Sequence, residues 1–181
     1  CWPSPMRRPR RHSSVADLAR FGGRAGRRAM AHRGPVREFL VLRAGEDDYG
    51  VELTGIREIL SPPPLTFVPR APRAVLGVCS VRGLLVTVLD LRRRLGLPSA
   101  PPTRRSRILL TVGTSGEIFG VLADEVRQVV RLSESEVELS SAVFGGDVAE
   151  HVVGIGRPKP GDDVIVLLDL VRLVDHLPEG D

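Results

Sequence analysis

Cysteine and long apolar runs are scarce in this chain of 181 residues, and each shortage excludes a class of protein. Only Cys1 and Cys79 occur, too few for a disulfide framework and consistent with a reducing compartment. Cys79 lies in an apolar run, which indicates a buried, inert thiol. The longest apolar runs, at 84–89 and 164–168, fall far short of the roughly 20 residues that cross a bilayer as a helix. The sequence therefore predicts no membrane insertion.

Motifs for nucleotide binding, nucleophilic catalysis and zinc binding are also absent from the sequence. The single lysine, Lys159, follows no Walker-type glycine loop, and no G-x-S-x-G elbow occurs. The histidines form no zinc motif with Cys79; they are His12, His32, His151 and His176. We therefore expect a protein that is not an enzyme, with no metal, no cofactor and no small-molecule substrate.

Positive charge is concentrated at the start of the chain. Residues 1–38 hold ten arginines against two acidic residues, a net charge of +8, which leaves −4 for residues 39–181. The Arg, Gly, Ala and Pro bias of residues 1–36 predicts a disordered tail. We expect this tail to be an upstream reading of a GC-rich gene whose functional start is Met30. The alternative is a polybasic arm that binds nucleic acid or acidic lipid.

Aromatic side chains make up 4% of the chain, which bears on nucleic-acid binding. Barrels that bind single strands stack bases on exposed aromatic rings along a basic groove. Here the folded part is net acidic, and Phe39, Tyr49 and Phe119 occupy strand patterns typical of a core. The composition argues against a nucleic-acid partner and leaves protein binding as the expected activity.

An internal repeat is the main feature that the sequence does contain. "YGVELTGIREIL" at 49–60 aligns without a gap with "FGVLADEVRQVV" at 119–130. Overlapping the start of each copy, "EFLVLRAGEDDYGVEL" and "RILLTVGTSGEIFGVL" place a turn rich in Gly, Asp or Ser between two β-prone runs. This pattern indicates a hairpin followed by a short helical turn. Thr54 and Asp124 fall at equivalent positions, and we expect both to cap that turn.

A second pair of segments repeats further along the chain. Residues 75–95 and 152–174 each hold two apolar runs around a turn, then an aspartate, Asp90 or Asp169, that opens a short helix. Short strands spaced by turns predict small β-barrels rather than a parallel α/β sheet. Because one repeat alone buries little surface, we expect two barrels that pack together and form a groove. Residues 98–103 are interpreted as a linker.

Four blocks, taken in order, resemble the CheW family of chemotaxis coupling proteins across residues 38–177. The blocks are "FLVLRAGEDDYGVELTGIREIL", "VPRAPRAVLGVCSVRGLLVTVLDLRRRLGL", "IFGVLADEVRQVVRLSESEV" and "VVGIGRPKPGDDVIVLLDLVRLV". The resemblance implies an all-β fold of two SH3-like five-stranded β-barrels related by the repeat, with short helices. Residues 37–100 and 104–177 would be the two halves of one CheW-like domain, with an exchange of strands between the barrels left open.

The same resemblance implies a non-catalytic adaptor that couples transmembrane chemoreceptors to a CheA-type histidine kinase. The receptor's cytoplasmic hairpin tip is expected in the groove between the barrels, and the kinase's regulatory domain on outer surfaces. Such a protein would be cytoplasmic and recruited to the inner face of the membrane through its receptors. The alternative is a CheW-like scaffold of a non-flagellar kinase pathway that controls surface motility or development.

Seven residues match family positions linked to receptor or kinase binding: Ile56, Glu58, Gly77, Arg82, Gly83, Gly120 and Gly154. Arg82 is suited to pair with Glu58 or with a receptor carboxylate, because its planar guanidinium bonds bidentately. The repeat partner of Glu58 is Gln128, so the fold does not demand a charge there. For the glycines, a requirement of the backbone is the alternative to a contact role.

Overall fold

The computed structural model describes residues 34–139, 150–158, 161, 163–175 and 177. Residues 1–33 of the predicted Arg-rich tail and the predicted start at Met30 lie outside these residues, and Val36 already opens a strand. Lys159 and three of the four histidines, all except His151, also lie outside them.

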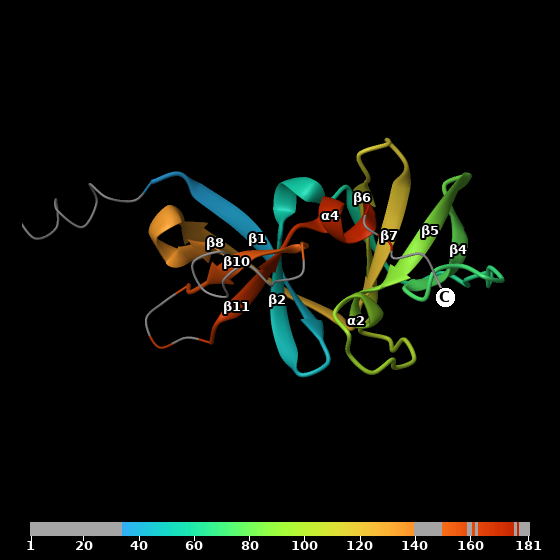
Figure 1. The fold of residues 1–181 in the computed structure, drawn as a ribbon, viewed down its shortest axis with the longest axis horizontal. Coiled ribbons are helices and arrows are strands. Elements are labelled where there is room, and N and C mark those ends of the chain that lie inside the picture. The colour runs from blue at the N-terminus through green and yellow to red at the C-terminus, as the bar shows by residue number, and fades with distance from the viewer. Residues whose placement is uncertain (1–33, 140–149, 159–160, 162, 176, 178–181) are drawn as a thin grey trace, which may run out of the picture. The chain divides into compact units, whose positions relative to one another are not determined.

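Strands dominate the described chain and confirm the all-β class (Figure 1). The elements up to the middle of the chain are β1 (Val36–Ala44), β2 (Asp47–Glu52), the 3₁₀ turn η1 (Leu53–Gly55), β3 (Glu58–Leu60), β4 (Val75–Val81), β5 (Leu84–Asp90) and α2 (Leu91–Arg94). They are followed by β6 (Arg107–Val112), β7 (Ile118–Ala123), β8 (Glu125–Ser133), the 3₁₀ turn η2 (Glu134–Glu136), β9 (Val137–Leu139), β10 (Val152–Gly156), β11 (Ile165–Leu168) and α4 (Leu170–Asp175). Neither these helices nor any other helix in the described ranges is long and apolar enough to cross a bilayer.

The strands form two sheets. Sheet A has the order β8-β1-β2-β11-β10-β9, and sheet B has the order β3-β6-β7-β5-β4. Sheet B has the expected five strands, whereas sheet A has six because β9 pairs with β10 at its edge. Its counterpart in sheet B is reduced to a single bridge between Thr66 and Val78. Figure 1 shows the strands of sheet A on the left, those of sheet B on the right and α4 between them.

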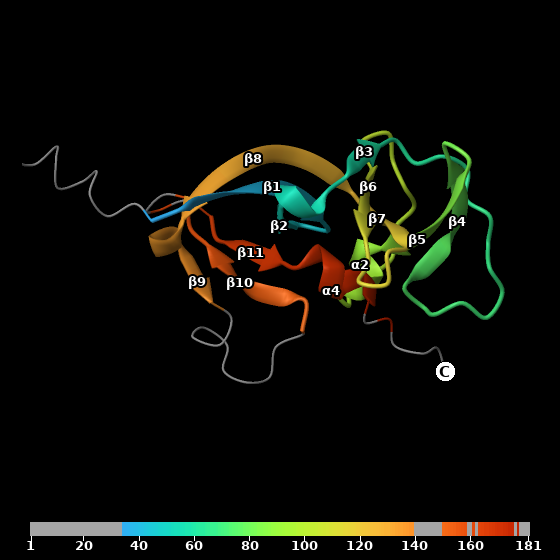
Figure 2. The same cartoon turned by 90° about the horizontal axis from the view of Figure 1, so that it is seen from above.

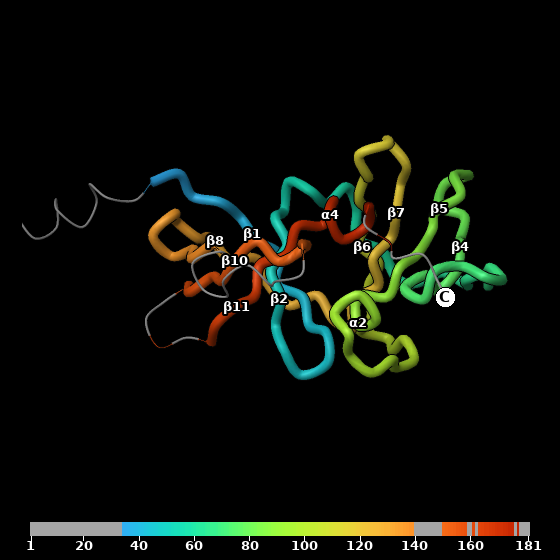
Figure 3. Tube along the Cα trace, viewed as in Figure 1, coloured from blue at the N-terminus to red at the C-terminus, as the bar shows by residue number. Residues whose placement is uncertain are grey.

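The two sheets do not correspond to the two halves of the sequence. Sheet A combines β1 and β2 with strands from the end of the chain, while sheet B combines β3, β4 and β5 with β6 and β7. The chain crosses between the sheets after β2 and again after β7, a path that can be followed in Figure 3. Residues 98–103 therefore connect two elements on the side of sheet B rather than one barrel to the other. The residue limits of the two halves stay a prediction.

The repeat is visible in how the exchanged hairpins attach. Strand β2 runs parallel to β11, with Tyr49 opposite Val166, and β7 runs parallel to β5, with Phe119 opposite Thr87. Each repeated hairpin thus joins the last strand of the other repeat. Strand β1 pairs on the side away from β2 with the long edge strand β8, whose curved ribbon is seen in Figure 2.

Three apolar clusters hold these strands together. One lies within sheet A and includes Phe39 and Val41, and one lies within sheet B and includes Val86 and Ile108. The largest cluster, here called the central cluster, draws residues from both sheets and from both helices: Leu40, Leu42, Ala44, Tyr49, Val51, Leu89, Leu91, Leu109, Val121, Ala123, Leu168, Leu170, Leu173 and Val174. Successive residues of one strand point to opposite faces, so β1 supplies the central cluster and the interior of sheet A alternately. That arrangement explains why its apolar run is nearly continuous.

The two predicted helix caps at the ends of β5 and β11 are confirmed. An Asp90 side-chain oxygen accepts a hydrogen bond from the backbone N–H of Arg92 at 2.9 Å. In the second repeat, Asp169 accepts from the N–H groups of Val171 at 3.0 Å and Arg172 at 3.1 Å. Both aspartates satisfy donors that a first helical turn leaves unpaired.

The expectation for Thr54 and Asp124 is wrong, because neither caps a helix. Thr54 lies inside η1, whose N-cap residue is Glu52 without a side-chain hydrogen bond. Asp124 is followed directly by β8, since the second repeat continues as a strand where the first forms a 3₁₀ turn. The carboxylate of Asp124 instead accepts hydrogen bonds from other elements at the second crossing between the sheets.

Asp124 ties the β1–β2 turn to α2. Its carboxylate accepts from the N–H of Gly45 at 2.8 Å and from Arg92, whose guanidinium lies 2.7 Å away. Its own N–H donates to the carbonyl of Arg43 at 3.0 Å. Both charged side chains are largely covered, with 20% of Arg92 and 31% of Asp124 exposed. The second crossing is thereby bonded to elements of both sheets.

Asp124→Asn keeps the size of the side chain but removes its charge, so the variant tests this connection. We expect the free energy of unfolding to fall by about 1.5–3 kcal/mol, as for a hydrogen bond to a charged group. Urea denaturation measures the loss. The matched control is Glu138→Gln, whose pair with Arg157 is about half exposed on both sides. That change should cost no more than about 1 kcal/mol. Equal losses in the two variants would contradict a special role for Asp124.

Candidate functional site

The β4–β5 turn is built from two of the predicted site residues. Val81 pairs with Leu84, which leaves Arg82 and Gly83 as a two-residue loop. Their φ angles are +51° and +82°, as a type I′ hairpin turn requires. A Cβ on Gly83 would meet no atom within 4 Å, so the glycine is explained by its φ angle rather than by lack of space. The turn holds the backbone of Arg82 in a defined position and projects its side chain outward.

The structure brings Arg82 and Glu58 together. A guanidinium nitrogen of Arg82 lies 2.6 Å from a carboxylate oxygen of Glu58, which stands at the start of β3 opposite Leu110 of β6. The Arg82 side chain is 76% exposed and that of Glu58 is 33% exposed. An ion pair this open to water contributes at most about 1 kcal/mol to folding. It therefore leaves both charges accessible to a partner.

This ion pair borders a groove with an apolar wall, here called the Glu58–Arg82 groove. Its volume is about 360 Å³, and it is lined by Arg57, Glu58, Val81, Arg82, Leu84, Val86, Leu110 and Ile118. The backbone N–H of Arg57 donates to the carbonyl of Leu110 at 2.8 Å, which fixes this edge of sheet B. Apolar side chains beside one carboxylate and two guanidinium groups can bind an amphipathic protein segment.

Ile56 lies near this groove in the sequence but does not line it. The residue follows η1 at the first crossing between the sheets, and its N–H donates to the carbonyl of Leu53 at 3.1 Å. Its half-buried side chain packs against the central cluster. The structure thus gives Ile56 a packing role at the crossing, and its predicted contact with a partner stays a prediction.

Gly77 and Gly154 occupy equivalent positions at bulges in β4 and β10. A Cβ on Gly77 would collide with the carbonyl oxygen of Thr66, and one on Gly154 with that of Glu138. Both glycines are buried and let a neighbouring backbone approach closely. Gly120 of β7 is buried too, and its Cβ would lie 2.7 Å from a methyl of Ile108. Gly77 and Gly154 are thus explained by a neighbouring backbone and Gly120 by the Ile108 side chain, and the role of all three in binding stays a prediction.

Exposed apolar side chains near the same hairpin were missed by sequence reasoning. Leu84 is 55% exposed and Leu85 is 74% exposed, and both follow the Arg82-Gly83 turn. Phe67, 75% exposed, comes directly after Thr66, which bridges to Val78 of β4. The signal was present at 84–85, because two successive leucines in a hairpin place one on each face of the sheet. No sequence signal marked Phe67, since its exposure depends on how its loop lies against β4.

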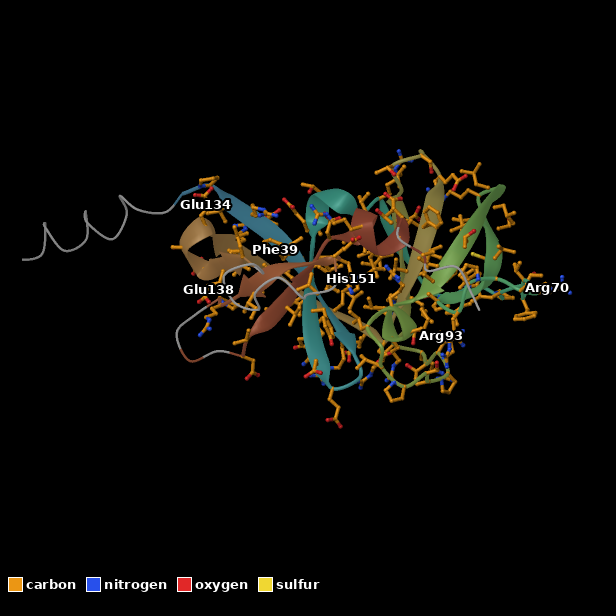
Figure 4. All side chains as sticks on the ribbon, viewed as in Figure 1. Phe39, Arg70, Arg93, Glu134, Glu138 and His151 are labelled. Carbon is orange, nitrogen blue, oxygen red and sulfur yellow. The ribbon has the colours of Figure 1, made fainter. Side chains whose placement is uncertain are left out.

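Within the described ranges, the groups with shifted pKa values are explained by burial and by contacts that hold the fold together. Burial raises the pKa of the Cys79 thiol within sheet B, as expected for an inert cysteine. Burial also raises the pKa of Asp90, whose carboxylate caps α2. Burial, with Arg94 nearby, lowers the pKa of His151, which precedes β10 (Figure 4). No group of His, Cys, Asp and Glu within the described ranges is arranged to hold a metal ion.

Comparison with known proteins gives consistent matches. The model of the CheW-like domain family matches residues 38–177. The chain is 32% identical over 148 residues to Protein FrzA of Myxococcus xanthus, which covers 81% of this chain and 91% of that protein. It is 31% identical over 102 residues to Chemotaxis protein CheW of Rhizobium meliloti, covering 56% of this chain and 65% of that protein, less than two thirds of its length.

A solved structure also matches the fold. It is the crystal structure of scaffolding protein TtCheW from Thermoanaerobacter tengcongensis, with a TM-score of 0.68 and 26% sequence identity. The match covers 78% of this chain and 94% of the other. The overall fold of this chain therefore resembles one that has been determined by crystallography.

Stability should depend on pH through His151. Its pKa in the folded protein lies below the ordinary 6.5, so the unfolded chain binds the proton more readily as the pH falls. We expect the free energy of unfolding to decrease from about pH 6.5 downward, and His151→Gln to remove that part of the decrease. Urea denaturation of both proteins at each pH measures the difference. The raised pKa of Asp90 acts with the opposite sign, but it is common to both proteins. Identical pH profiles would contradict the assignment to His151.

Gly154→Ala separates a backbone role from a binding role. Because the added methyl meets a carbonyl oxygen, we expect a loss of about 1–3 kcal/mol in the free energy of unfolding, measured by urea denaturation. Gly55→Ala is the matched control, since a Cβ there meets nothing within 4 Å. It should stay within about 0.5 kcal/mol of the parent. A stable Gly154→Ala variant that binds its partners poorly would instead support a contact role.

Proposed function

The chain belongs to the CheW-like domain family, and we propose that it is a non-catalytic adaptor that couples chemoreceptors to a CheA-type histidine kinase in chemotaxis signalling. The observation that carries the proposal is the Glu58–Arg82 groove, where an exposed ion pair borders an apolar wall at a rigid turn. Its chemistry suits recognition of a protein segment, and the shifted titratable groups lie elsewhere in the fold.

We assign the Glu58–Arg82 groove to the cytoplasmic hairpin tip of a receptor. The groove offers leucine, valine and isoleucine side chains beside a carboxylate and two guanidinium groups, which suits a segment with apolar and charged side chains. Arg82 is supplied by a type I′ turn, so little backbone freedom is lost when it binds. A receptor carboxylate can take the place of Glu58 as the partner of Arg82.

We assign the exposed apolar residues of sheet B to the kinase's regulatory domain. Leu85 and Phe67 are each about three quarters exposed, and neither lines the Glu58–Arg82 groove. A contiguous exposed apolar patch marks an interaction surface, and we propose that Leu85 and Phe67 belong to one such patch. A separate surface for each partner allows both to bind at once, as an adaptor requires.

Coupling then follows from simultaneous binding. An adaptor transmits a receptor state only if it binds the receptor–kinase assembly differently in its two states. The protein would work in the cytoplasm and be held at the inner face of the membrane through its receptors.

A second candidate function keeps the adaptor role but changes the pathway. The relative from Myxococcus xanthus is named FrzA rather than CheW, and its match covers 81% of this chain. This supports a scaffold in a kinase pathway for surface motility or development. Deleting the gene and measuring swimming and surface spreading separately distinguishes the two pathways.

Reversing the charge of Arg82 tests the receptor site. We expect Arg82→Glu to weaken binding to a receptor cytoplasmic fragment at least about tenfold, because it places two carboxylates side by side at the groove. The thermal midpoint should hardly change, since the pair is exposed. Binding is measured by cosedimentation with the receptor fragment.

The double variant Glu58→Arg with Arg82→Glu is the matched control. It restores an internal ion pair with the charges exchanged. If Arg82 contacts the receptor, binding stays weak in the double variant. Full recovery of binding would show that Arg82 acts only through Glu58, and a collapse of the fold in the single variant would assign the pair a structural role.

Leu85→Asp tests the kinase surface. The change places a charge on an exposed strand position, so folding should be preserved while binding to the regulatory domain of the kinase weakens at least about tenfold. Calorimetric titration with that domain measures the affinity. The matched control is Leu139→Asp on β9, where the parent side chain is 62% exposed on the other sheet. Equal weakening by both changes would contradict a kinase surface on sheet B.

A further inference from the structure

A second groove lies beside α2 and the loop that follows it, and its walls are rich in arginine. Its volume is about 670 Å³, and it is lined by Arg73, Ala74, Arg93, Arg94, Gly96, Leu97, Pro98 and Ser99. Figure 4 shows Arg93 next to this loop. The groove shares no lining residue with the Glu58–Arg82 groove. We call this arginine-rich groove the α2 groove.

The three arginines of the α2 groove face no carboxylate among its lining residues. Arg93 is held in place, because its guanidinium donates to the hydroxyl of Ser99 at 3.1 Å and to the carbonyl of Arg73 at 3.0 Å. Its ion pair with Asp90 spans 3.4 Å, and Asp90 is almost fully buried beneath it. The ion pairs found across the described residues include neither Arg73 nor Arg94.

Arg94 gives the second, independent observation. Its Nε is buried and has no hydrogen-bond partner within the described part of the chain. Burial lowers the pKa of this guanidinium, whose charge helps to lower the pKa of His151, a group that is not an anion. A buried donor without an acceptor is costly to the fold. An anion that enters the groove would offset that cost.

The size and walls of the α2 groove favour a peptide over a small ion. Ala74, Leu97 and Pro98 provide apolar surface beside the guanidinium groups. The backbone N–H groups of Gly96 and Leu97 already donate to carbonyls of α2, so the loop does not form an amide cradle for a phosphate. A single phosphate would leave most of the volume to water, whereas a segment with acidic and apolar side chains matches both kinds of wall.

We propose that the α2 groove binds a segment of a protein partner that carries acidic side chains next to apolar ones. Arg73 and Arg94 pair with the carboxylates, Arg93 keeps the shape of the groove through Ser99, and the apolar wall contacts the neighbouring side chains. Residues 39–181 carry a net negative charge, which repels an acidic segment in general. Attraction of such a segment is therefore confined to the arginines of the α2 groove. It provides this protein with a third contact surface that does not depend on receptor or kinase binding.

The test uses the full chain and a short fluorescein-labelled peptide of alternating glutamate and leucine, followed by fluorescence anisotropy. We expect saturable binding that weakens at least about tenfold in Arg73→Gln and in Arg94→Gln, since each loses a charged hydrogen bond. Arg73 is exposed, so its variant keeps the test valid if Arg94→Gln fails to fold. Arg157→Gln, on the other sheet and about half exposed, is the matched control and should bind as the parent does.

Two further probes separate the possible ligands. A peptide of alternating lysine and leucine should not bind, and inorganic phosphate in moderate excess should not displace the acidic peptide. Displacement by phosphate would overturn the assignment to a protein segment and leave a site for small anions. Equal binding of the acidic peptide by the parent, Arg73→Gln and Arg94→Gln would overturn the site itself.

Discussion

The central cluster between the two sheets is the constraint on which the rest of the structure depends. It is filled from β1 and β2 on one side, from β5, β6 and β7 on the other, and by the helices α2 and α4. Each sheet also encloses a cluster of its own, so strands such as β1 and β6 bury both faces. Because each sheet also contains strands from both halves of the sequence, neither sheet is complete without strands from the other half.

The candidate sites lie at the β4–β5 turn and at the end of α2, outside the central cluster. The Arg82-Gly83 turn caps a hairpin whose inward residues are fixed in sheet B, and the ion pair with Glu58 connects it to the neighbouring edge. The α2 groove forms where a four-residue helix stops and the chain turns back toward β6. In both places arginine side chains lie at the end of a fixed element, and Arg73 and Arg82 are exposed. Partner binding therefore depends on charges that the core does not require.

Local features of the fold were predictable from the sequence, and distant pairings were not. Asp90 and Asp169 cap helices because each lies next to the donors that it satisfies. The same local logic fails at Asp124, whose partners Gly45 and Arg92 are brought close only by the crossing of the chain. The need for glycine at 154 comes from a carbonyl on β9, and the exposure of Phe67 from the path of its loop. Of the predicted site, the Glu58–Arg82 pair was foreseen as one of two options, while the α2 groove had no sequence signal.

The exchange of hairpins also determines the order in which the protein can fold during synthesis. Tyr49 of β2 pairs with Val166 of β11, so sheet A closes only after almost the whole domain has left the ribosome. Sheet B is different, because its last strand, β7, is made well before the end of the chain. Until β11 arrives, the β1–β2 hairpin exposes apolar side chains and an unpaired strand edge, the features that expose a nascent chain to aggregation. Sheet B can form first, and its residues of the central cluster are then buried when the last strands of sheet A are added.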